Sequence, residues 1–278
     1  MVKVSVCLIC YNQEKYIEQT LQSIFDQDYP HLEVIIADDC STDNSQNIIQ
    51  SFLDKNHLDW NFLPANVNVG MQKNWQNCIE AATGDYIALL EGDDFWNDPN
   101  KIQKQVDILE HDKTLAACFT NSLVINEMSD RHFPEYVTDK IDRLTFRNIL
   151  KGNNIPTCTV LFRRHKIDFP SAYFNSPYVD WIIHLSNAKT GDYFFLDEKT
   201  STYRLHENGA YGGQSEINRN LKMIKTLECL KLIFSDKDTV KVINQNLKDS
   251  FQKVAYLYKE MNQSAKFYKF KIKSKLLA

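Results

Sequence analysis

Residues 2–53 read VKVSVCLICYNQEKYIEQTLQSIFDQDYPHLEVIIADDCSTDNSQNIIQSFL, and two hydrophobic periods alternate within them. Residues 2–9 and 32–37 are continuous apolar runs rich in β-branched side chains, which are typical of strands buried on both faces. Residues 14–25 and 45–53 instead carry apolar side chains at helical spacing. The stretch therefore predicts two successive strand–helix units, the arrangement that builds a parallel sheet.

The same alternation continues along the chain. Further strands are predicted at 60–63, 86–90, 115–124, 158–163, 193–196 and 200–205. Further helices are predicted at 74–82, 99–109, 181–188, 217–230 and 240–261. The sequence thus predicts an α/β protein with a mainly parallel sheet flanked by helices, followed by a C-terminal helical extension.

The composition is that of a folded protein, because 43% of the 278 residues are hydrophobic and 24% are charged. The formal net charge of −4 provides no basic excess for binding nucleic acid. Seven scattered cysteines, an odd number, favour a reduced cytoplasmic protein over a disulfide scaffold. No secretory signal is visible, and no apolar run reaches the roughly 18 residues of a membrane-spanning helix.

Polar clusters follow the predicted strands at the points where each strand ends. They are Tyr11-Asn12, Asp38-Asp39, residues 66–70 and residues 91–94. Ligands of open parallel sheets bind beyond the carboxyl ends of the strands, so we expect these clusters to surround one binding site.

The sequence Glu91-Gly92-Asp93-Asp94 places three carboxylates within four residues directly after an apolar strand. Neighbouring carboxylates repel unless a cation or water compensates their charge. Oxygen ligands of this kind suit Mg²⁺ or Mn²⁺, and Mg²⁺ usually shares its shell with phosphates. The alternative is an acidic loop that caps the helix beginning near Pro99.

Asp38 and Asp39 are candidates for hydrogen bonding to ribose hydroxyls or to a base N–H. The alternative is a capping role in the loop 41–43, whose Ser, Thr and Asp side chains are common caps. Tyr11 either stacks on a nucleobase or lies half-buried in the core. Lys73 and Asn74 follow Gly70 at a predicted helix start, a position that suits an anion.

These pieces, in this order, resemble a family 2 glycosyltransferase with the GT-A fold. The matching segments are Val4-Ser5-Val6 to Cys10-Tyr11-Asn12, Ala37-Asp38-Asp39-Cys40-Ser41-Thr42-Asp43, Asn68-Val69-Gly70, Gly84-Asp85-Tyr86-Ile87 into Glu91-Gly92-Asp93-Asp94, Val179-Asp180-Trp181 and Tyr203-Arg204-Leu205-His206. The resemblance covers roughly residues 1–212 and implies an inverting, nucleotide-sugar-dependent enzyme. The chain departs from the family pattern at Glu91, which replaces an Asp, at Cys40, which replaces a Gly, and at Val179, which replaces an acid.

The resemblance also implies a role for each matching residue. Nucleotide binding is expected from Tyr11, Asn12, Asp38, Asp39, Asn68 and Gly70, with Tyr11 against uracil and Asp39 on the uridine. Lys73 is added to this set because of its position at the predicted helix start. Metal binding is expected from Glu91, Asp93, Asp94 and His206. Asp180 is the expected general base, which removes the proton of the acceptor hydroxyl.

Several of these side chains have structural alternatives. Asp180 could cap the helix that follows it, and His206 could be an ordinary hydrogen-bonded histidine. Arg204 could approach a phosphate or form an ion pair. Trp96 and Trp181 either wall the acceptor site or pack in the core.

The sequence therefore predicts a glycosyltransferase domain at 1–215 and a helical extension at 216–278 with a basic aromatic tail. Its donor is expected to be UDP-linked, its cofactor Mn²⁺ or Mg²⁺, and its acceptor a hydroxyl of a glycan or lipid-linked sugar. Residues 266–278 are either a contact with an anionic membrane or a solvated final helix. The expected location is cytoplasmic, and it becomes peripheral at the inner face of the membrane under the first of these two alternatives for the tail. The alternatives are a non-catalytic nucleotide or sugar binder and a nucleotidyltransferase, although no glycine-rich phosphate loop is present.

Overall fold

The computed structural model describes residues 2–129, 135–137, 142–209 and 212–277. Its centre is a mixed sheet in the order β3-β2-β1-β4-β8-β6-β9-β5, with β7 paired to β9. The strands are β1 Val4–Cys10, β2 Leu32–Asp38, β3 Asp59–Pro64, β4 Tyr86–Glu91, β5 Phe95–Trp96, β6 Leu115–Asn126, β7 Arg143–Leu144, β8 Leu161–Arg163 and β9 Asp192–Leu205. Strands β3, β2, β1 and β4 are parallel neighbours, so their carboxyl ends meet at one edge of the sheet.

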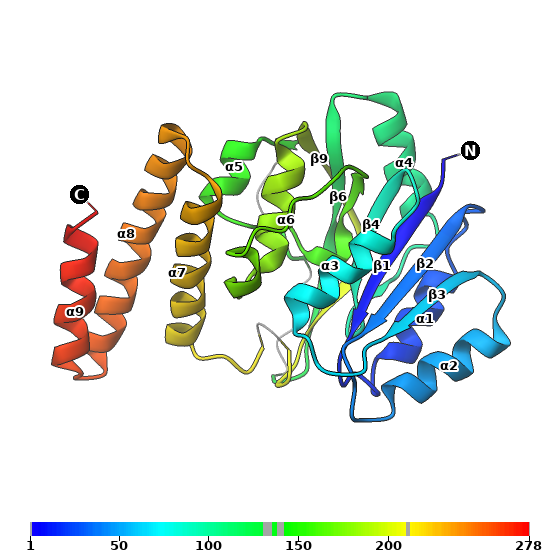
Figure 1. Cartoon of the computed structure of the whole chain (residues 1–278), viewed down its shortest axis with the longest axis horizontal. Coiled ribbons are helices and arrows are strands. Elements are labelled where there is room, and N and C mark those ends of the chain that lie inside the picture. The colour runs from blue at the N-terminus through cyan, green and yellow to red at the C-terminus, as the bar shows by residue number, and fades with distance from the viewer. Residues whose placement is uncertain (1, 130–134, 138–141, 210–211, 278) are drawn as a thin grey trace.

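Helices cover both faces of this sheet, and three more extend from one end of the molecule (Figure 1). They are α1 Ile17–Phe25, α2 Ser45–Lys55, α3 Met71–Ala81, α4 Lys101–His111, α5 Phe146–Lys151, α6 Val179–Ala188, α7 Glu216–Ile233, α8 Lys237–Glu260 and α9 Ser264–Lys275. Short 3₁₀ turns lie at Thr157–Thr159 and Tyr173–Asn175. The expected fold class is confirmed, including the helical extension.

Two hydrophobic clusters, one on each face of the sheet, explain the uninterrupted apolar strands. Val4, Val6 and Leu8 of β1 pack with α1, α2 and α4, whereas Cys7 and Ile9 pack with α3 and α6. The second cluster continues without a break into α7 and α8. The division at residues 215/216 stays a prediction, although α7 begins at Glu216.

The elements α5, β5 and β7 were not predicted from the sequence, and three further local differences concern predicted elements. The two strands expected at 193–196 and 200–205 are one strand, β9. The strand expected at 158–163 begins only at Leu161, because Pro156 leads into a 3₁₀ turn. Asn44, rather than Ser41 or Asp43, occupies the position before α2, and its side chain makes no capping hydrogen bond. None of the described helices is both long and apolar enough to cross a membrane.

Candidate active site

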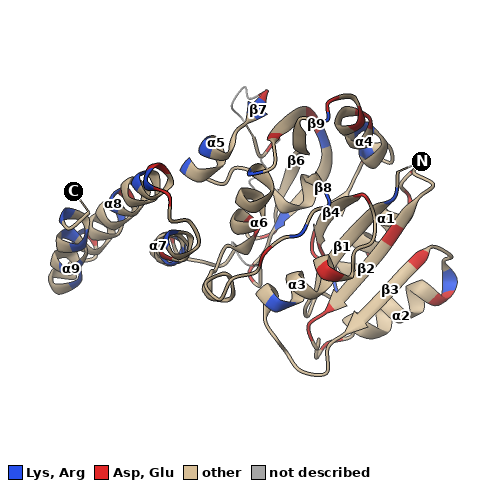
Figure 2. Cartoon of the chain, turned by 45° about the horizontal axis from the view of Figure 1, so that its top comes forward, with Lys and Arg blue, Asp and Glu red and all other residues tan. Residues whose placement is uncertain are grey.

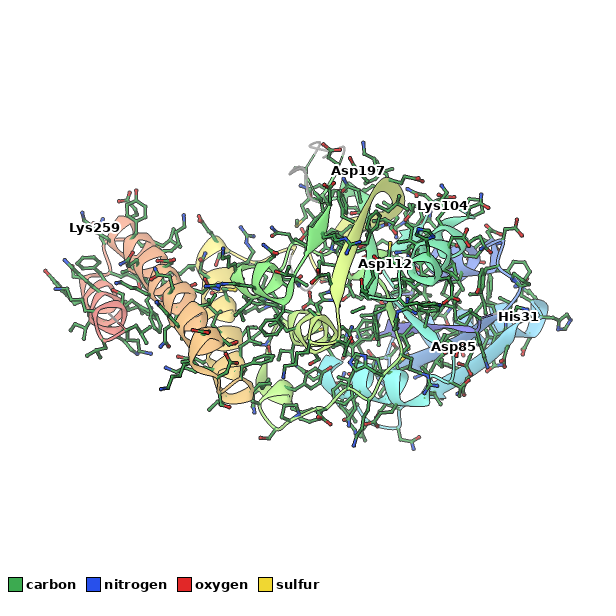
Figure 3. The ribbon with its side chains drawn as sticks, turned by 90° about the horizontal axis from the view of Figure 1, so that it is seen from above. His31, Asp85, Lys104, Asp112, Asp197 and Lys259 are labelled. Atoms are coloured by element: carbon green, nitrogen blue, oxygen red, sulfur yellow. The ribbon has the colours of Figure 1, made fainter. Side chains whose placement is uncertain are left out.

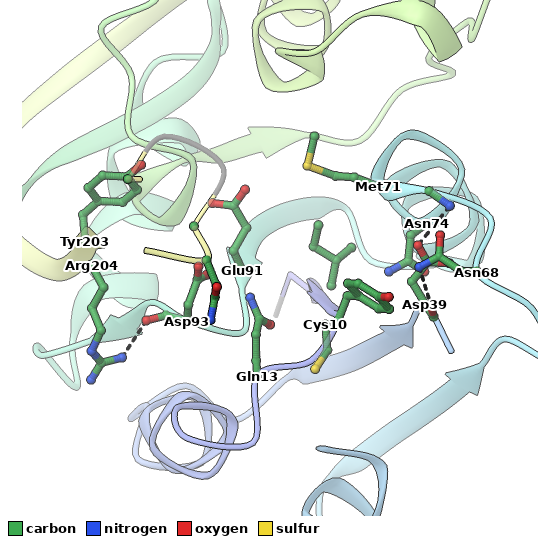
Figure 4. Close-up of a pocket in the computed structure, with 16 residues that line it drawn as sticks. Cys10, Gln13, Asp39, Asn68, Met71, Asn74, Glu91, Asp93, Tyr203 and Arg204 are labelled. Carbon is green, nitrogen blue, oxygen red and sulfur yellow. Dashed lines mark hydrogen bonds between the residues drawn. The ribbon is translucent and has the colours of Figure 1, made fainter. Parts of the chain in front are cut away.

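A cavity of about 340 Å³ lies beyond the carboxyl ends of β1 and β4. Figure 4 shows Asp39, Asn68 and Asn74 on one side of it and Asp93, Tyr203 and Arg204 on the other. The described residues that line it are Ile9, Cys10, Tyr11, Gln13, Asp39, Asn68, Gly70, Met71, Asn74, Glu91, Asp93, Tyr203, Arg204, Asn208, Gly209 and Gly212. We call this space the donor cavity.

Asp39 anchors the loop that borders one side of the donor cavity. Its two carboxylate oxygens accept hydrogen bonds from the backbone N–H groups of Val69, at 2.6 Å, and Gly70, at 2.9 Å. Burial raises the pKa of the Asp39 carboxyl, although the two N–H donors act in the opposite direction. Gly70 has a φ of 86°, a conformation that glycine adopts without strain, and it leads directly into α3.

Asp93 and His206 form a close pair at the opposite side of the donor cavity. The Nε2 atom of His206 lies 2.9 Å from Oδ2 of Asp93. Arg204, two residues earlier in the chain, donates from its guanidinium to the backbone carbonyl of Asp93 at 2.6 Å. Its side chain also bonds to Gln19, and its charge lies over the ring of Tyr16. The end of β9 thus fixes the position of the loop that carries Asp93.

A second cavity, also of about 340 Å³, contains Asp180. Asn153 donates a hydrogen bond from Nδ2 to Oδ2 of Asp180 at 2.6 Å. Burial raises the pKa of Asp180 to about 6, although hydrogen bonds from Trp181 and Asn153 act against this shift. A carboxylate with this pKa is suited to removing a proton near neutral pH. We call this space the base cavity.

The two cavities share a wall formed by Met71, Glu91 and Tyr203. Burial, and then the nearby charges of Asp93, Asp94 and Asp180, hold the pKa of Glu91 well above its usual range. Glu91 therefore lies between the cavity of Asp93, which could hold a donor, and the cavity of Asp180, which could activate an acceptor. This junction is the place where a reaction between two bound molecules is geometrically possible.

The charge around the donor cavity bears on whether a cation fits it. The described lining contains three carboxylates, Asp39, Glu91 and Asp93, and Arg204 is its one basic side chain. Within the described parts of the chain, no set of three or more His, Cys, Asp and Glu side chains is arranged to hold a metal alone. Mg²⁺ commonly binds through one or two carboxylates together with substrate phosphates. Asp93 and His206 fit a divalent cation held jointly with a diphosphate.

The structure brings together most of the residues predicted from the sequence. Tyr11, Asp39, Asn68, Gly70, Glu91, Asp93 and Arg204 line the donor cavity, and Asp180, Trp181 and Glu91 line the base cavity. His206 joins the donor side through Asp93. The reading of Asp180 as a helix cap is wrong, because α6 begins at Val179 and Tyr178 precedes it.

Three predicted nucleotide-binding residues do not line the donor cavity. Asp38 is completely buried and accepts hydrogen bonds from Ser41 and Gln46. Asn12 lies outside the cavity, where its side chain accepts a hydrogen bond from the backbone N–H of Thr42. Lys73 bonds to Gln76, one turn further along α3. Asp38 and Asn12 therefore shape the loops around the cavity.

Asp94 and Trp96 likewise lie away from the positions expected of them. The Oδ1 atom of Asp94 accepts the backbone N–H of Arg204 at 2.8 Å, and the side chain is buried behind the cavity. Trp96 is buried in the core and donates from Nε1 to the carbonyl of Cys158 at 2.9 Å. Of the two alternatives for Trp96, the structure favours packing in the core, since Trp96 is not among the described residues that line either cavity.

The sequence prediction omitted several residues that line the cavities. Gln13 and Tyr203 contribute to the donor cavity, and Asn153 contributes to the base cavity. Gln13 and Tyr203 lie next to residues that were singled out, so their position near the strand ends was the available signal. Asn74, which was named with Lys73 at the start of a predicted helix, does line the donor cavity. Asn153 lies in a segment without a pattern and reaches Asp180 only through the fold.

The mixed α/β sheet with helices on both faces matches solved structures that have the GT-A fold. S. aureus TarS 1–349 in complex with UDP-GlcNAc has a TM-score of 0.60 at 16% identity, covering 96% of this chain and 90% of that one. A mannosyltransferase from Pyrobaculum calidifontis in complex with GDP-Man and Mn²⁺ has a TM-score of 0.63 at 16% identity, covering 99% and 84%.

The sequence itself matches the model described as Glycosyl transferase family 2 over residues 5–167. TuaG of Bacillus subtilis, named as a teichuronic acid biosynthesis glycosyltransferase, is 32% identical over 74% of this chain and 80% of its own. An uncharacterized protein of Mycobacterium tuberculosis is 34% identical over 74% of this chain, which spans 60% of the length of that relative. The chain belongs to glycosyl transferase family 2, which confirms the resemblance stated from its motifs.

Proposed function

We propose that this protein transfers a sugar from a nucleotide-sugar donor to an acceptor hydroxyl, with inversion at the anomeric carbon. The observation that carries the proposal is the shared wall at Glu91, which joins the donor cavity to the cavity of Asp180. A donor and an acceptor bound in these two spaces meet at one point. Holding two reactants in such an arrangement lowers the entropic part of the barrier.

The proposed donor is a UDP-sugar, with its base near Tyr11 and its uridine near Asp39 and Asn68. Tyr11 is exposed at the mouth of the cavity and offers a ring face for stacking. The similarity to TarS bound to UDP-GlcNAc supports a uridine nucleotide, whereas the Pyrobaculum enzyme was solved with GDP-Man. GDP is therefore the competing nucleotide in the test below.

The proposed cofactor is Mn²⁺ or Mg²⁺, held by Asp93 and His206 together with the donor diphosphate. A diphosphate would enter a cavity whose described lining already carries the carboxylates of Asp39 and Asp93 against one arginine, with a third carboxyl group, Glu91, whose pKa is raised. That arginine is engaged with the Asp93 carbonyl and Gln19, so it is not free to neutralise the phosphates. When bound, a divalent cation supplies Lewis-acid stabilisation of the charge on the leaving diphosphate.

Asp180 is the proposed general base. Its carboxylate accepts the proton of the acceptor hydroxyl as the oxygen attacks the anomeric carbon from the face opposite the diphosphate. Proton removal by a positioned carboxylate typically contributes about 10²–10⁴ in rate. A single displacement inverts the anomeric centre. The proposed acceptor is a hydroxyl of a glycan or of a lipid-linked sugar at the cytoplasmic face of a membrane.

The deciding test is calorimetric titration of UDP, GDP and TDP, each with and without Mn²⁺. We expect UDP to bind with micromolar affinity only when Mn²⁺ is present. Asp93→Asn is expected to abolish the Mn²⁺-dependent binding of UDP. Asp94→Asn is the matched control, since its side chain bonds to the Arg204 backbone and should leave binding intact.

Two results of this titration would count against the proposal. Equal losses of Mn²⁺-dependent UDP binding in Asp93→Asn and Asp94→Asn would contradict the proposal that Asp93, and not Asp94, binds the metal. A folded protein that binds no nucleotide under any condition would overturn the donor site and leave a non-catalytic member of the family.

A further inference from the structure

The outermost helix of the molecule, α9, has one face that packs on α8 and one face that is open (Figure 1). Phe267, Phe270 and Ser274 point inward; the ring of Phe270 stacks on Tyr258 with ring centres 5.6 Å apart. The open face carries Tyr268 and Ile272, followed by Leu276 one residue past the helix end. These side chains are 59%, 58% and 78% exposed.

The three open side chains form a single stripe. They are spaced by four residues, so successive members differ by only about 40° around the helix axis. Lys269 and Lys275 flank Ile272 at about 60° on either side, and Lys271 and Lys273 at about 100°. We call Tyr268, Ile272 and Leu276 the apolar stripe of α9.

The charge on this helix has one sign. Its twelve residues include five lysines and no acidic residue, although the whole chain has a net charge of −4. Figure 2 shows the lysines recurring along α9. The basic surface continues onto α8, where Lys237, Lys241 and Lys248 line a shallow hollow beside Leu277. A partner that covers the stripe must therefore be apolar at its centre and anionic around it.

We propose that α9 lies in the surface of an anionic lipid bilayer, with the apolar stripe inserted between headgroups and with Lys269 and Lys275 paired with lipid phosphates. An in-plane helix of this kind needs an apolar face flanked by lysines, whose stems can bury while the ammonium groups stay in water. At about 18 Å, α9 is too short to span a hydrocarbon core of about 30 Å.

A second copy of the chain fits this surface less well than a bilayer does. A two-fold contact through the stripe would place lysines of one copy opposite lysines of the other. Lysine is also depleted in the centres of protein interfaces. The stripe is one helix wide, whereas a stable interface usually buries about 800 Å² on each partner.

The arm formed by α7–α9 projects beyond the sheet, with Lys259 near its outer end (Figure 3). Binding through α9 would hold the protein next to a membrane, where a lipid-linked acceptor is concentrated. That consequence rests on the proposed function, whereas the contact between α9 and the bilayer does not.

The test is sedimentation of the full chain with vesicles of phosphatidylcholine alone or mixed with phosphatidylglycerol, over a range of salt. We expect binding only to the mixed vesicles, and weaker binding as salt rises. Lys269→Gln with Lys275→Gln should weaken binding on the order of tenfold or more, given about fivefold for each lysine. Lys55→Gln with Lys166→Gln, two exposed lysines of the sheet domain, should leave it unchanged.

The apolar stripe is tested by Tyr268→Ser, Ile272→Ser and Leu276→Ser combined, which should abolish vesicle binding. Leu232→Ser is the matched control, because this leucine of α7 is 79% exposed but lies outside the stripe. Equal binding to neutral vesicles, or loss in the Leu232 control, would overturn the proposal. So would stripe variants that alter the oligomeric state without altering vesicle binding, since a second copy would then be the partner.

Nucleotide titration of the stripe variant separates this inference from the proposed function. We expect unchanged Mn²⁺-dependent UDP binding, because α9 contributes no described residue to either cavity. Loss of vesicle binding with intact UDP binding would therefore concern the membrane contact alone.

Discussion

Asn153 donates a hydrogen bond to Asp180 at 2.6 Å, across 27 residues of sequence. The bond joins the segment after α5 to the first turn of α6. A hydrogen bond to the ionised form of a carboxyl favours that form. Asn153 therefore opposes the effect of burial on the pKa of Asp180 and favours the ionised form of this carboxyl, the form that the proposed base needs.

Asn153→Ala should move the pH dependence of the reaction. In the wild type, kcat/KM should rise as pH increases through about 6, the pKa of Asp180, because the base must be ionised. Without Asn153 this limb should shift to higher pH. Asn154→Ala, a neighbour that lines the same cavity, should leave the limb in place. If Asn153→Ala instead lowers kcat/KM by the same factor at all pH values, the residue only supports the local structure.

Asp180→Asn should abolish transfer but stabilise the fold near neutral pH. The pKa of Asp180 is raised from 3.8 to about 6 in the folded protein, so the folded state binds more protons than the unfolded state between these values. Stability is therefore lost as pH rises through this range, and the penalty is complete above it. Removing the charge should raise the free energy of unfolding by on the order of 1–3 kcal/mol near pH 7.

The check is urea unfolding of both proteins at neutral pH and at a pH below 3.8, where Asp180 is protonated in both states. The difference in the free energy of unfolding should vanish at the lower pH. A destabilised Asp180→Asn at neutral pH would show that the hydrogen bonds to the Asp180 carboxylate outweigh the effect of burial, which would contradict the raised pKa.

The sequence was sufficient to predict features that depend on neighbouring residues. The buried runs of β1 and β2 and the acidic loop at 91–94 are local patterns, and the structure places them as expected. The sequence was not sufficient to show that Asp93 lines the donor cavity whereas Asp94 does not. The two residues are adjacent and chemically identical. Asp94 differs only because its side chain accepts a hydrogen bond from the backbone N–H of Arg204, 110 residues away. Asn153 was missed for the same reason, since its partner is defined only by tertiary packing.

Trp96→Phe and Trp181→Phe should have different effects, although each tryptophan donates a buried hydrogen bond. The partners are the carbonyl of Cys158 for Trp96 and that of Ile149, at 2.7 Å, for Trp181. Both changes should lower the free energy of unfolding by about 1–3 kcal/mol. Only Trp181 lines the base cavity, so only its change should raise the KM for the acceptor. A matching rise in KM for Trp96→Phe would restore that residue to the acceptor site.

Glu33→Gln should weaken the fold at neutral pH from a position remote from both cavities. Glu33 of β2 accepts hydrogen bonds from Lys3, Ser5 and Thr83. These three residues lie near the beginnings of the neighbouring strands β1 and β4. Burial raises its pKa, but these donors outweigh burial and lower the pKa to about 2. The stability that they confer is complete above the unfolded value of 4.5 and is lost as pH falls towards 2.

The expected loss for Glu33→Gln is on the order of 2–3 kcal/mol near pH 7, measured by urea unfolding, with kcat unchanged. Asp59→Asn is the matched control: Asp59 also pairs with Lys3, at 3.3 Å, but its side chain is 66% exposed. An exposed pair contributes little, so this change should cost less than about 1 kcal/mol. Equal losses in the two variants would show that the charge of Lys3, rather than the buried bonds to Ser5 and Thr83, gives Glu33 its effect. Because Asp180 acts in the opposite direction at higher pH, the wild type should be most stable where Asp180 is protonated and Glu33 is still ionised.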